Sequence, residues 1–263
     1  MVEINATNLN VFSERTHIIK NLSLKIPANQ VTAIIGPNGS GKSTLLKTLS
    51  GLMKPHSGKV YIDKQSIDFY SRKQLARKMS FLMQNPEAPG SMTVKELVSF
   101  GRFSHQTWFG FNENGQDQIH WAIKQVNLED KSDHCLSKLS GGQQKRAWIA
   151  MALAQNSDVL LLDEPTAFLD IRHQLETLLL LQKLKKELGK TIVVVLHDIP
   201  QVIQFADYLI IIDQGRLMHQ STIQSNLDPQ LFEKVFGIQV ELKHNPFQGT
   251  SLTIHGVAET QGS

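Results

Sequence analysis

Hydrophobic and polar positions alternate along the first 30 residues, which is typical of strands that bury one face. Apolar side chains recur over residues 4–11 and again over 18–26, and we expect these segments to pair as antiparallel strands. The β-branched run Val31–Ile35 then predicts a fully buried strand. A glycine-rich loop follows at once, and residues 43–50 have the composition of a helix. Strand, loop and helix in this order indicate an α/β fold.

Strands and helices continue to alternate along the chain, except in one central segment. The pattern predicts strands over residues 59–62, 79–83, 159–163, 191–196, 208–213 and 216–220, and helices over 72–78, 171–188 and 198–205. A short helix and two weaker strands are expected after Asp228. Residues 85–155 lack β-branched runs and contain three predicted helices, over 93–101, 116–126 and 143–154. We therefore expect a mostly parallel sheet, formed by residues 1–84 and 156–263, with a helical domain inserted at 85–155.

Composition agrees with a well-packed protein of a reducing compartment. Hydrophobic residues make up 41% and charged residues 19% of the 263 positions, enough for a large core. The longest apolar runs reach about five residues, far below the ~20 that span a bilayer, and we expect no secretory signal. The single cysteine, Cys135, cannot form an internal disulfide. The net charge of +3 is spread along the chain, without the dense basic stripe that nucleic-acid binding favours.

The segment after the first buried strand matches the pattern G-x-x-x-x-G-K-[ST]. Glycines let successive backbone N–H groups of such a loop point into one concavity that holds phosphate oxygens. The helix that follows presents the positive end of its dipole. Lys42 would add a charge near the β- and γ-phosphates of ATP, and the Ser43 hydroxyl would ligate Mg²⁺. The residues predicted to bind ATP are Gly36, Pro37, Asn38, Gly39, Ser40, Gly41, Lys42, Ser43 and Thr44.

An acidic pair, Asp163-Glu164, follows the apolar strand that begins at Val159. Ligand sites in open α/β sheets form at the carboxyl ends of strands, so both carboxylates are expected near the phosphate loop. Asp163 is placed to hold Mg²⁺, and Glu164 to polarise the attacking water. Neighbouring residues on a strand point to opposite faces, which would allow the two carboxylates to take different roles.

A third motif, Leu139-Ser140-Gly141-Gly142-Gln143, precedes a predicted helix and offers a second anion site at that helix's N-terminus. Phosphate loops and acidic pairs occur in many NTPases, but with this motif the sequence resembles the ATP-binding subunits of ABC transporters. The resemblance extends to the positions of the Q-loop glutamine, the D-loop aspartate and the switch histidine, which are Gln84, Asp170 and His197. The motifs stand in family order across almost the whole chain. The resemblance therefore implies a P-loop NTPase fold of the ABC type.

The resemblance also implies how these residues work. Two copies would form a head-to-tail homodimer, in which the signature residues of one copy contact the ATP held by the phosphate loop of the other. The signature residues are Ser140, Gly141, Gly142 and Gln143. Glu164 would act as the general base, and the other catalytic residues would be His197, Gln84 and Lys42, with Mg²⁺ held by Ser43, Gln84 and Asp163. The surface over about residues 85–102 would dock a coupling helix of a membrane-spanning permease.

The adenine contact is open at this point. ABC ATPases usually stack adenine on an aromatic side chain near the first strand pair, and in this chain that register falls at Phe12. An aromatic face of any kind can stack on the base. Phe12 is therefore either the adenine contact or a core residue of its strand.

Two further segments narrow the resemblance. The run Leu169-Asp170-Ile171-Arg172-His173-Gln174 and the run Gly101-Arg102-Phe103-Ser104-His105 are similar to segments of the importers of iron chelates, which take up ferric siderophores, haem or cobalamin. Ser104 replaces the proline usual in the second segment. The resemblance thus implies a peripheral subunit on the cytoplasmic side of a bacterial inner membrane, with a substrate-binding protein as an indirect partner.

Two other functions compete with this interpretation. A soluble ABC ATPase that serves iron–sulfur assembly or translation would have no membrane partner, but tandem ATPase domains or long charged linkers would favour it, and the chain has neither. A nucleotide-sensing scaffold without turnover would lack Glu164 or His197, and both are present. The importer subunit is the function that the sequence favours.

Overall fold

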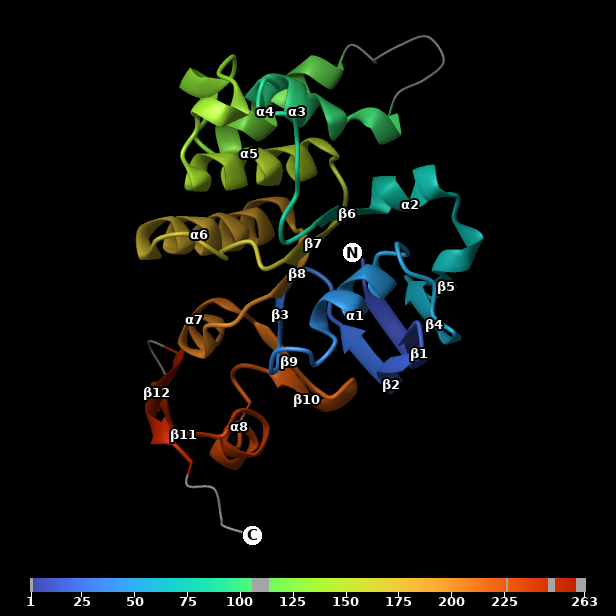
Figure 1. Ribbon diagram of the computed structural model, residues 1–263, viewed down its shortest axis with the longest axis vertical. Coiled ribbons are helices and arrows are strands. Elements are labelled where there is room, and N and C mark those ends of the chain that lie inside the picture. The colour runs from blue at the N-terminus through green and yellow to red at the C-terminus, as the bar shows by residue number, and fades with distance from the viewer. Residues whose placement is uncertain (1, 106–113, 226, 246–248, 259–263) are drawn as a thin grey trace.

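The computed structural model describes residues 2–105, 114–225, 227–245 and 249–258 (Figure 1). Its strands are β1 (Ile4–Ser13), β2 (Thr16–Ile26), β3 (Val31–Ile35), β4 (Ser57–Ile62), β5 (Gln65–Ser66), β6 (Met79–Leu82), β7 (Val159–Asp163), β8 (Thr191–Val195), β9 (Tyr208–Asp213), β10 (Arg216–Thr222), β11 (Ile238–Asn245) and β12 (Gly249–Val257). Its α-helices are α1 (Lys42–Leu49), α2 (Arg72–Lys78), α3 (Val94–Phe100), α4 (Asn114–Gln125), α5 (Gly141–Ala154), α6 (Ile171–Leu188), α7 (Ile199–Phe205) and α8 (Pro229–Phe236). Among the described helices, none has the length and apolar character needed to cross a bilayer.

Six strands form the central sheet, in the order β10–β9–β3–β8–β7–β6. All pairs are parallel except the hairpin of β9 and β10. Strands covered by helices on both faces of a parallel sheet are apolar throughout, and β3, β7 and β8 are buried at every position. The predicted α/β fold with a mostly parallel sheet is thereby confirmed.

Helix α1 is enclosed between the central sheet and a second, antiparallel sheet of order β2–β1–β4–β5 (Figure 1). Leu45, Leu46 and Leu49 of α1 are completely buried in a core shared with β1, β2 and one face of the central strands. The other face of the central sheet packs against α6, α7 and α8. The sheet is therefore held between two apolar layers, which fixes where its strand ends point.

The helical segment between β6 and β7 lies at one end of the molecule, where α3, α4 and α5 pack together (Figure 1). Capping boxes begin two of these helices: Thr93 with Glu96 at α3, and Ser140 with Gln143 at α5. Apolar side chains of this segment join the same core as one face of the central sheet. The packing thus holds the start of α5 at a defined distance from the strand ends.

The turn Gln214-Gly215 between β9 and β10 supports the phosphate loop. The Gly215 N–H donates to the Ser40 carbonyl (3.0 Å), and the Gly215 carbonyl accepts from the Lys20 N–H (2.9 Å). Gly215 has φ 78°, and a Cβ atom there would lie 1.9 Å from the carbonyl oxygen of Ile18. Only glycine satisfies both the left-handed backbone and this close approach. The hairpin of β9 and β10 therefore also positions Ser40.

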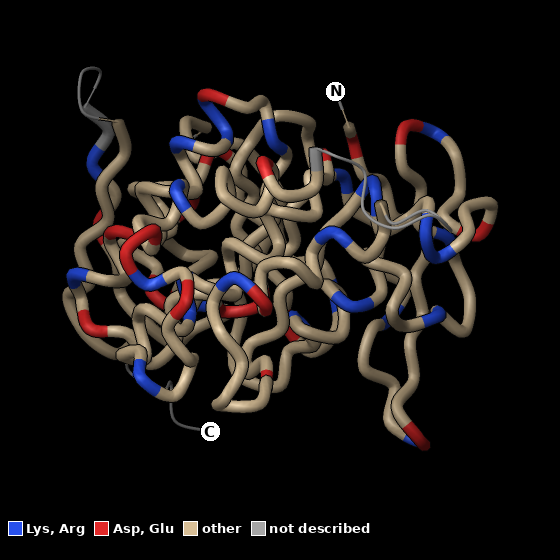
Figure 2. Tube along the Cα trace, turned by 90° about the horizontal axis from the view of Figure 1, so that it is seen from above, with Lys and Arg blue, Asp and Glu red and all other residues tan. Residues whose placement is uncertain are grey.

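Lys and Arg alternate with Asp and Glu over the described trace (Figure 2). No single face of the described residues in this view carries a continuous basic band. The three lysines at positions 183, 185 and 186 lie on α6, where Lys185 pairs with Asp207 (2.9 Å). The charge distribution agrees with the mild net charge of the sequence.

We predict that Gly215→Ala destabilises the protein by several kcal/mol. Gly237→Ala is the matched control, because Gly237 also has a positive φ (66°) but a Cβ there would meet no atom within 4 Å. The control should cost only about 1 kcal/mol, the usual penalty of a left-handed conformation. Urea unfolding of both variants measures the difference, and equal losses would contradict the proposed contact with Ile18.

Candidate functional site

Four neighbouring strands of the central sheet end at one edge, and each delivers a residue that the sequence singled out. The phosphate loop begins at Gly36 after β3, and His197 follows β8. Asp163 is the last residue of β7, and Gln84 lies two residues beyond β6. Since β3, β8, β7 and β6 are adjacent and parallel, these four positions meet at their carboxyl ends. The structure thus brings together residues separated by up to 161 positions (197 − 36).

The phosphate loop has the backbone that an anion cradle requires. Gly39 and Gly41 take left-handed conformations, with φ 77° and 100°, and a Cβ at Gly39 would meet no atom within 4 Å. The Ser40 hydroxyl is buried and has no hydrogen-bond partner among the described residues. The open space at Gly39, together with an unpaired hydroxyl in the same loop, fits a bound phosphate.

Lys42 is almost fully buried at the start of α1. Its Nζ donates to the carbonyls of Gly36 and Pro37, each at 2.9 Å. Burial lowers the pKa of Lys42, and the charges of Glu164 and Asp163 oppose this shift. The ammonium is therefore held against the loop itself, at the position from which it would reach a phosphate.

Ser43 and Asp163 form the oxygen pair expected of a magnesium site. The Ser43 hydroxyl donates to Oδ1 of Asp163 at 3.0 Å. Asp163 is 3% exposed, and burial raises its pKa, which the hydrogen bond from Ser43 opposes. Mg²⁺ prefers hard oxygen ligands and is usually bound by one or two carboxylates together with substrate phosphates. A hydroxyl, a buried carboxylate and an adjacent phosphate cradle fit this ion.

Glu164 connects the acidic pair to the two neighbouring strand ends. Its Oε1 accepts from Nε2 of His197 at 2.5 Å, and its Oε2 accepts from the side-chain amide of Gln84. The sequence argument expected the two carboxylates to diverge because they alternate on a strand, and this reason is wrong. β7 ends at Asp163, and Glu164 has φ 50°. A left-handed turn, not strand alternation, aims Glu164 toward His197.

Lys145 is a residue of this site that the sequence analysis missed. It lies on α5, and its Nζ donates to the backbone carbonyl of Gln84 at 2.7 Å. It is 9% exposed, and burial lowers its pKa, against the opposing charges of Asp163 and Glu164. It lies four residues before the buried Ile149 and therefore on the inner face of the helix. The helical periodicity of the sequence could have identified it as a residue that faces inward.

The signature and D-loop residues lie away from the phosphate loop of their own chain. The Ser140 hydroxyl accepts from the Gln143 N–H within its own helix, and α5 and α1 lie on opposite sides of β6 and β7 in Figure 1. Gly141 is exposed, with no atom within 4 Å of an added Cβ. Asp170 caps α6 and accepts from His173. One chain therefore presents two separate surfaces with phosphate-binding chemistry.

Phe12 is 43% exposed, so it is not a core residue of β1. Its ring stacks on His17 of β2, with ring centroids 4.1 Å apart and an interplanar angle of 9°. The His56 ring meets it edge-on at 5.2 Å. Phe12 is therefore a partly exposed aromatic residue near the strand pair, with one face of its ring on His17.

The fold and this site define a P-loop nucleotide-binding protein with a carboxylate beside its phosphate cradle. A model of the ABC transporter family matches residues 19–167. The chain is 44% identical over 230 residues to the iron(3+)-hydroxamate import ATP-binding protein FhuC of Bacillus subtilis (strain 168), covering 87% of this chain and 86% of FhuC. It is 41% identical over 238 residues to the ferric enterobactin transport ATP-binding protein FepC of Escherichia coli (strain K12), covering 90% and 88%.

Solved structures agree with these relatives. The dimeric structure of MJ0796, described as a bacterial ABC transporter cassette, superposes with a TM-score of 0.75 at 32% identity, covering 85% of this chain and all of that chain. The chain belongs to the ABC transporter family, as one of its ATP-binding, ATP-hydrolysing subunits.

We predict that Asp163→Asn raises the thermal stability at neutral pH by about 2–4 °C, equivalent to roughly 1 kcal/mol for a chain of this size. The amide retains an acceptor for Ser43 but removes a buried charge. Because burial raises the folded-state pKa of Asp163, the wild type loses stability as the pH rises from the unfolded-state pKa, about 3.9, to the folded-state pKa. The difference in unfolding temperature between the variant and the wild type should thus be constant at neutral pH and vanish toward pH ~4.

Thermal unfolding across this pH range measures the effect. Asp133→Asn, at an exposed position, serves as the control and should leave the unfolding temperature unchanged. A lower unfolding temperature for Asp163→Asn at neutral pH would show that the carboxylate charge stabilises the empty site.

Proposed function

We propose that this chain drives the uptake of an iron chelate, most closely a ferric siderophore, as the ATPase subunit of a bacterial importer. The contact of Glu164 with both His197 and Gln84, directly beside the Ser43–Asp163 pair, carries the catalytic part of this proposal. The substrate class is supported by the relatives, whose names assign them to iron(3+)-hydroxamate and ferric enterobactin. Haem and cobalamin belong to the wider class that the sequence resembles.

The residues divide the work of ATP hydrolysis among themselves. The amides of the phosphate loop and Lys42 hold the phosphates, and Ser43 and Asp163 supply oxygens to Mg²⁺, whose charge neutralises the phosphate oxygens in the transition state. Glu164 lies between two strand ends, where it can approach the attacking water. It accepts a proton from this water. His197 and Gln84 orient Glu164 through their hydrogen bonds, and His197 also stabilises the γ-phosphate.

ATP sits between two copies of the chain in this proposal. The open face at Ser140 and Gly141 points away from the phosphate loop of the same chain and receives the nucleotide of the second copy. Phe168 and Ile171, which flank the D-loop Asp170, are 90% and 80% exposed, and large apolar side chains at such exposure are typical of an interface. Phe12, which is partly exposed, then stacks on the adenine.

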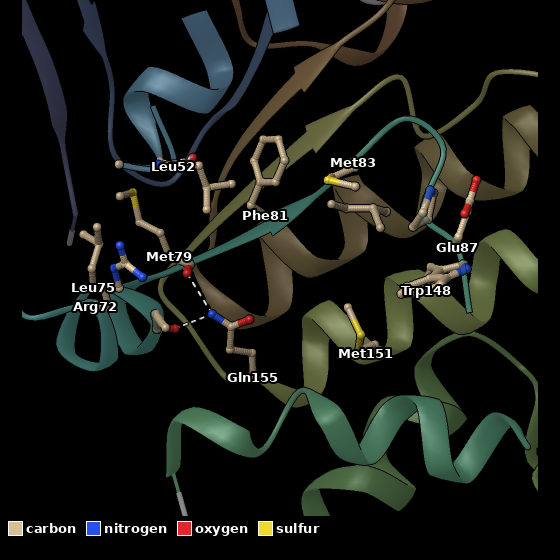
Figure 3. Close-up of a pocket in the computed structure, with 15 residues that line it drawn as sticks. Leu52, Arg72, Leu75, Met79, Phe81, Met83, Glu87, Trp148, Met151 and Gln155 are labelled. Atoms are coloured by element: carbon tan, nitrogen blue, oxygen red, sulfur yellow. Dashed lines mark hydrogen bonds between the residues drawn. The ribbon is translucent and has the colours of Figure 1, made fainter. Parts of the chain in front are cut away.

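A groove lined by apolar side chains gives the membrane partner a docking surface (Figure 3). It encloses about 680 Å³ and lies between α2, β6 and α5, with Met79, Phe81 and Met151 among its walls. The sequence argument placed this surface over residues 85–102, but only Pro86 and Glu87 of that range line the groove. We propose that a helix of the membrane-spanning partner occupies it, because Leu52 on its rim is 65% exposed and the groove reaches Met83, next to Gln84.

This docking would hold the chain on the cytoplasmic face of the cell membrane as a peripheral subunit. Gln84 would then connect the partner to the nucleotide, since the residue that contacts Glu164 follows the groove residue Met83 directly. The substrate-binding protein would contact the permease rather than this chain.

We predict that Glu164→Gln lowers the turnover of ATP by at least about 100-fold, the usual contribution of a general base, while ATP binding is retained. Steady-state phosphate release and nucleotide binding measure the two properties separately. Glu233→Gln, at an exposed position on α8, is the control and should hydrolyse ATP like the wild type. Substantial turnover by pure Glu164→Gln protein would exclude Glu164 as the base.

We predict that Leu52→Asp weakens the association with the membrane-spanning partner by about tenfold or more, because it buries a charge in an apolar contact. Leu188→Asp is the matched control, an exposed leucine at the end of α6, away from the groove. Affinity purification from detergent-solubilised membranes measures the recovered partner. Equal recovery with both variants would argue against the groove. A wild-type chain that recovers no membrane protein would favour the soluble ABC ATPase.

A further inference from the structure

The first turn of α6 holds an ordered pair of side chains, His173 and Asp170. The Asp170 carboxylate accepts from the His173 backbone N–H at 2.9 Å, and both of its oxygens lie 2.8 Å from Nδ1 of the His173 ring. A carboxylate can only accept, so Nδ1 carries the hydrogen in this contact. These hydrogen bonds hold the pKa of Asp170 below its ordinary value. The ring of His173 is thereby fixed in orientation.

The ring lies flat against the signature glycine Gly142. A Cβ atom built there would lie 3.0 Å from Cδ2, 3.0 Å from Cγ and 3.3 Å from Nδ1 of His173. A point at nearly equal distance from three ring atoms lies above the face of the ring, not beside its edge. Gly142 lies within α5 and has no positive φ, so a side chain at this position would be crowded by the ring and not strained by the backbone conformation. A Cβ at Gly141, by contrast, would be in open space.

The same turn of α6 contacts the segment that follows the switch histidine. Gln174 donates to the Leu169 carbonyl (2.8 Å) and accepts from the side chain of Gln201 (2.9 Å). The Gln201 N–H in turn donates to Asp198, the neighbour of His197. Helix α6 therefore connects the D-loop to the start of α7.

An ion-pair bridge ties α6 to α5 beside the His173–Gly142 contact. Glu176 lies 3.0 Å from Arg172 on its own helix and 3.6 Å from Arg146 on α5. Both helices are thus joined at two adjacent points near their N-termini. A displacement of the start of α5 would be transmitted to α6 rather than absorbed between them.

The backbone between Glu164 and Asp170 is a short, hydrogen-bonded turn. The Ala167 N–H donates to the Glu164 carbonyl (3.2 Å), and the Leu169 N–H donates to the Thr166 carbonyl (3.3 Å). A displacement of Asp170 is therefore not absorbed by a long flexible loop. It reaches Glu164 through six residues.

We propose that His173 is a positioning residue that links the two nucleotide sites, by packing on Gly142 while its Nδ1–H is held by Asp170. This inference rests on the proposed function, in which Gly142 contacts the ATP of the second copy and Glu164 acts on the ATP of its own chain. Closure on one nucleotide presses Gly142 against the ring, and the ring moves Asp170 and the turn that carries Glu164. If this turn served only to cap α6, Asp170 and the backbone would be sufficient. The contact of His173 with Gly142 would then have no role.

A double-mutant cycle in the full-length chain tests the contact. Gly142→Ala alone should lower the unfolding temperature, because its methyl group overlaps the ring, and adding His173→Ala should recover most of that loss. Gly141→Ala is the matched control, and its effect should simply add to that of His173→Ala. Additive effects at both glycines would overturn the contact. This measurement does not depend on ATP hydrolysis.

Kinetics then test the link between the sites. His173→Ala should lower kcat by about tenfold with a smaller change in KM, and it should lower the Hill coefficient for ATP toward 1, because coupling energies between sites are typically 5–150-fold effects. His173→Phe keeps the packing and His173→Asn keeps a donor for Asp170, and neither alone should restore the Hill coefficient. An unchanged Hill coefficient in His173→Ala would overturn the link. If Glu164→Gln still abolishes turnover in that case, the proposed function stands without it.

Discussion

The alignment of four parallel strands is the constraint on which the site depends. β3, β8, β7 and β6 are paired in register, so that Ile34 and Asp163 both lie opposite Val195. Each segment of the site begins within two or three residues of this paired position. These segments are the phosphate loop, the acidic pair, the switch histidine and Gln84. Close packing on both faces opposes sliding of the strands, because a shift of one residue would exchange side chains of different shape between the two layers.

Burial of charge is the second condition at this edge. Lys42, Lys145 and Asp163 are each less than 10% exposed, and burial shifts the pKa of each toward the neutral form. Charges of opposite sign in one poorly solvated region stabilise one another more strongly than they would in water. The arrangement lowers the cost of holding these buried charges at the edge of the sheet. Groups whose pKa is shifted by burial in this way are typical of functional sites.

The start of α5 and the phosphate loop lie on separate surfaces of the chain. The signature helix α5 is anchored to the central sheet by Lys145, which reaches the Gln84 carbonyl, and to α6 by Arg146 and His173. These contacts connect the start of α5 with the edge of the central sheet where the strands end. The groove beside β6 adjoins α5 as well. The strand ends, α5 and α6 thus form a single packed unit.

The sequence by itself determined the order of the elements and the identity of most site residues. The bounds of β7 and α6 agree with the predicted 159–163 and 171–188, because an apolar run and a capped amphipathic helix are local patterns. The phosphate loop was equally local, since its glycines, lysine and serine are contiguous.

Only the tertiary structure decided how separated residues meet. The left-handed turn at Glu164, the burial of Lys145 and the ring of His173 over Gly142 depend on packing between elements far apart in the chain. The exposure of Phe12 and the walls of the groove beside β6 likewise depend on neighbours from other segments. Periodicity and motif spacing describe one segment at a time, whereas these contacts arise where two segments exclude solvent from each other.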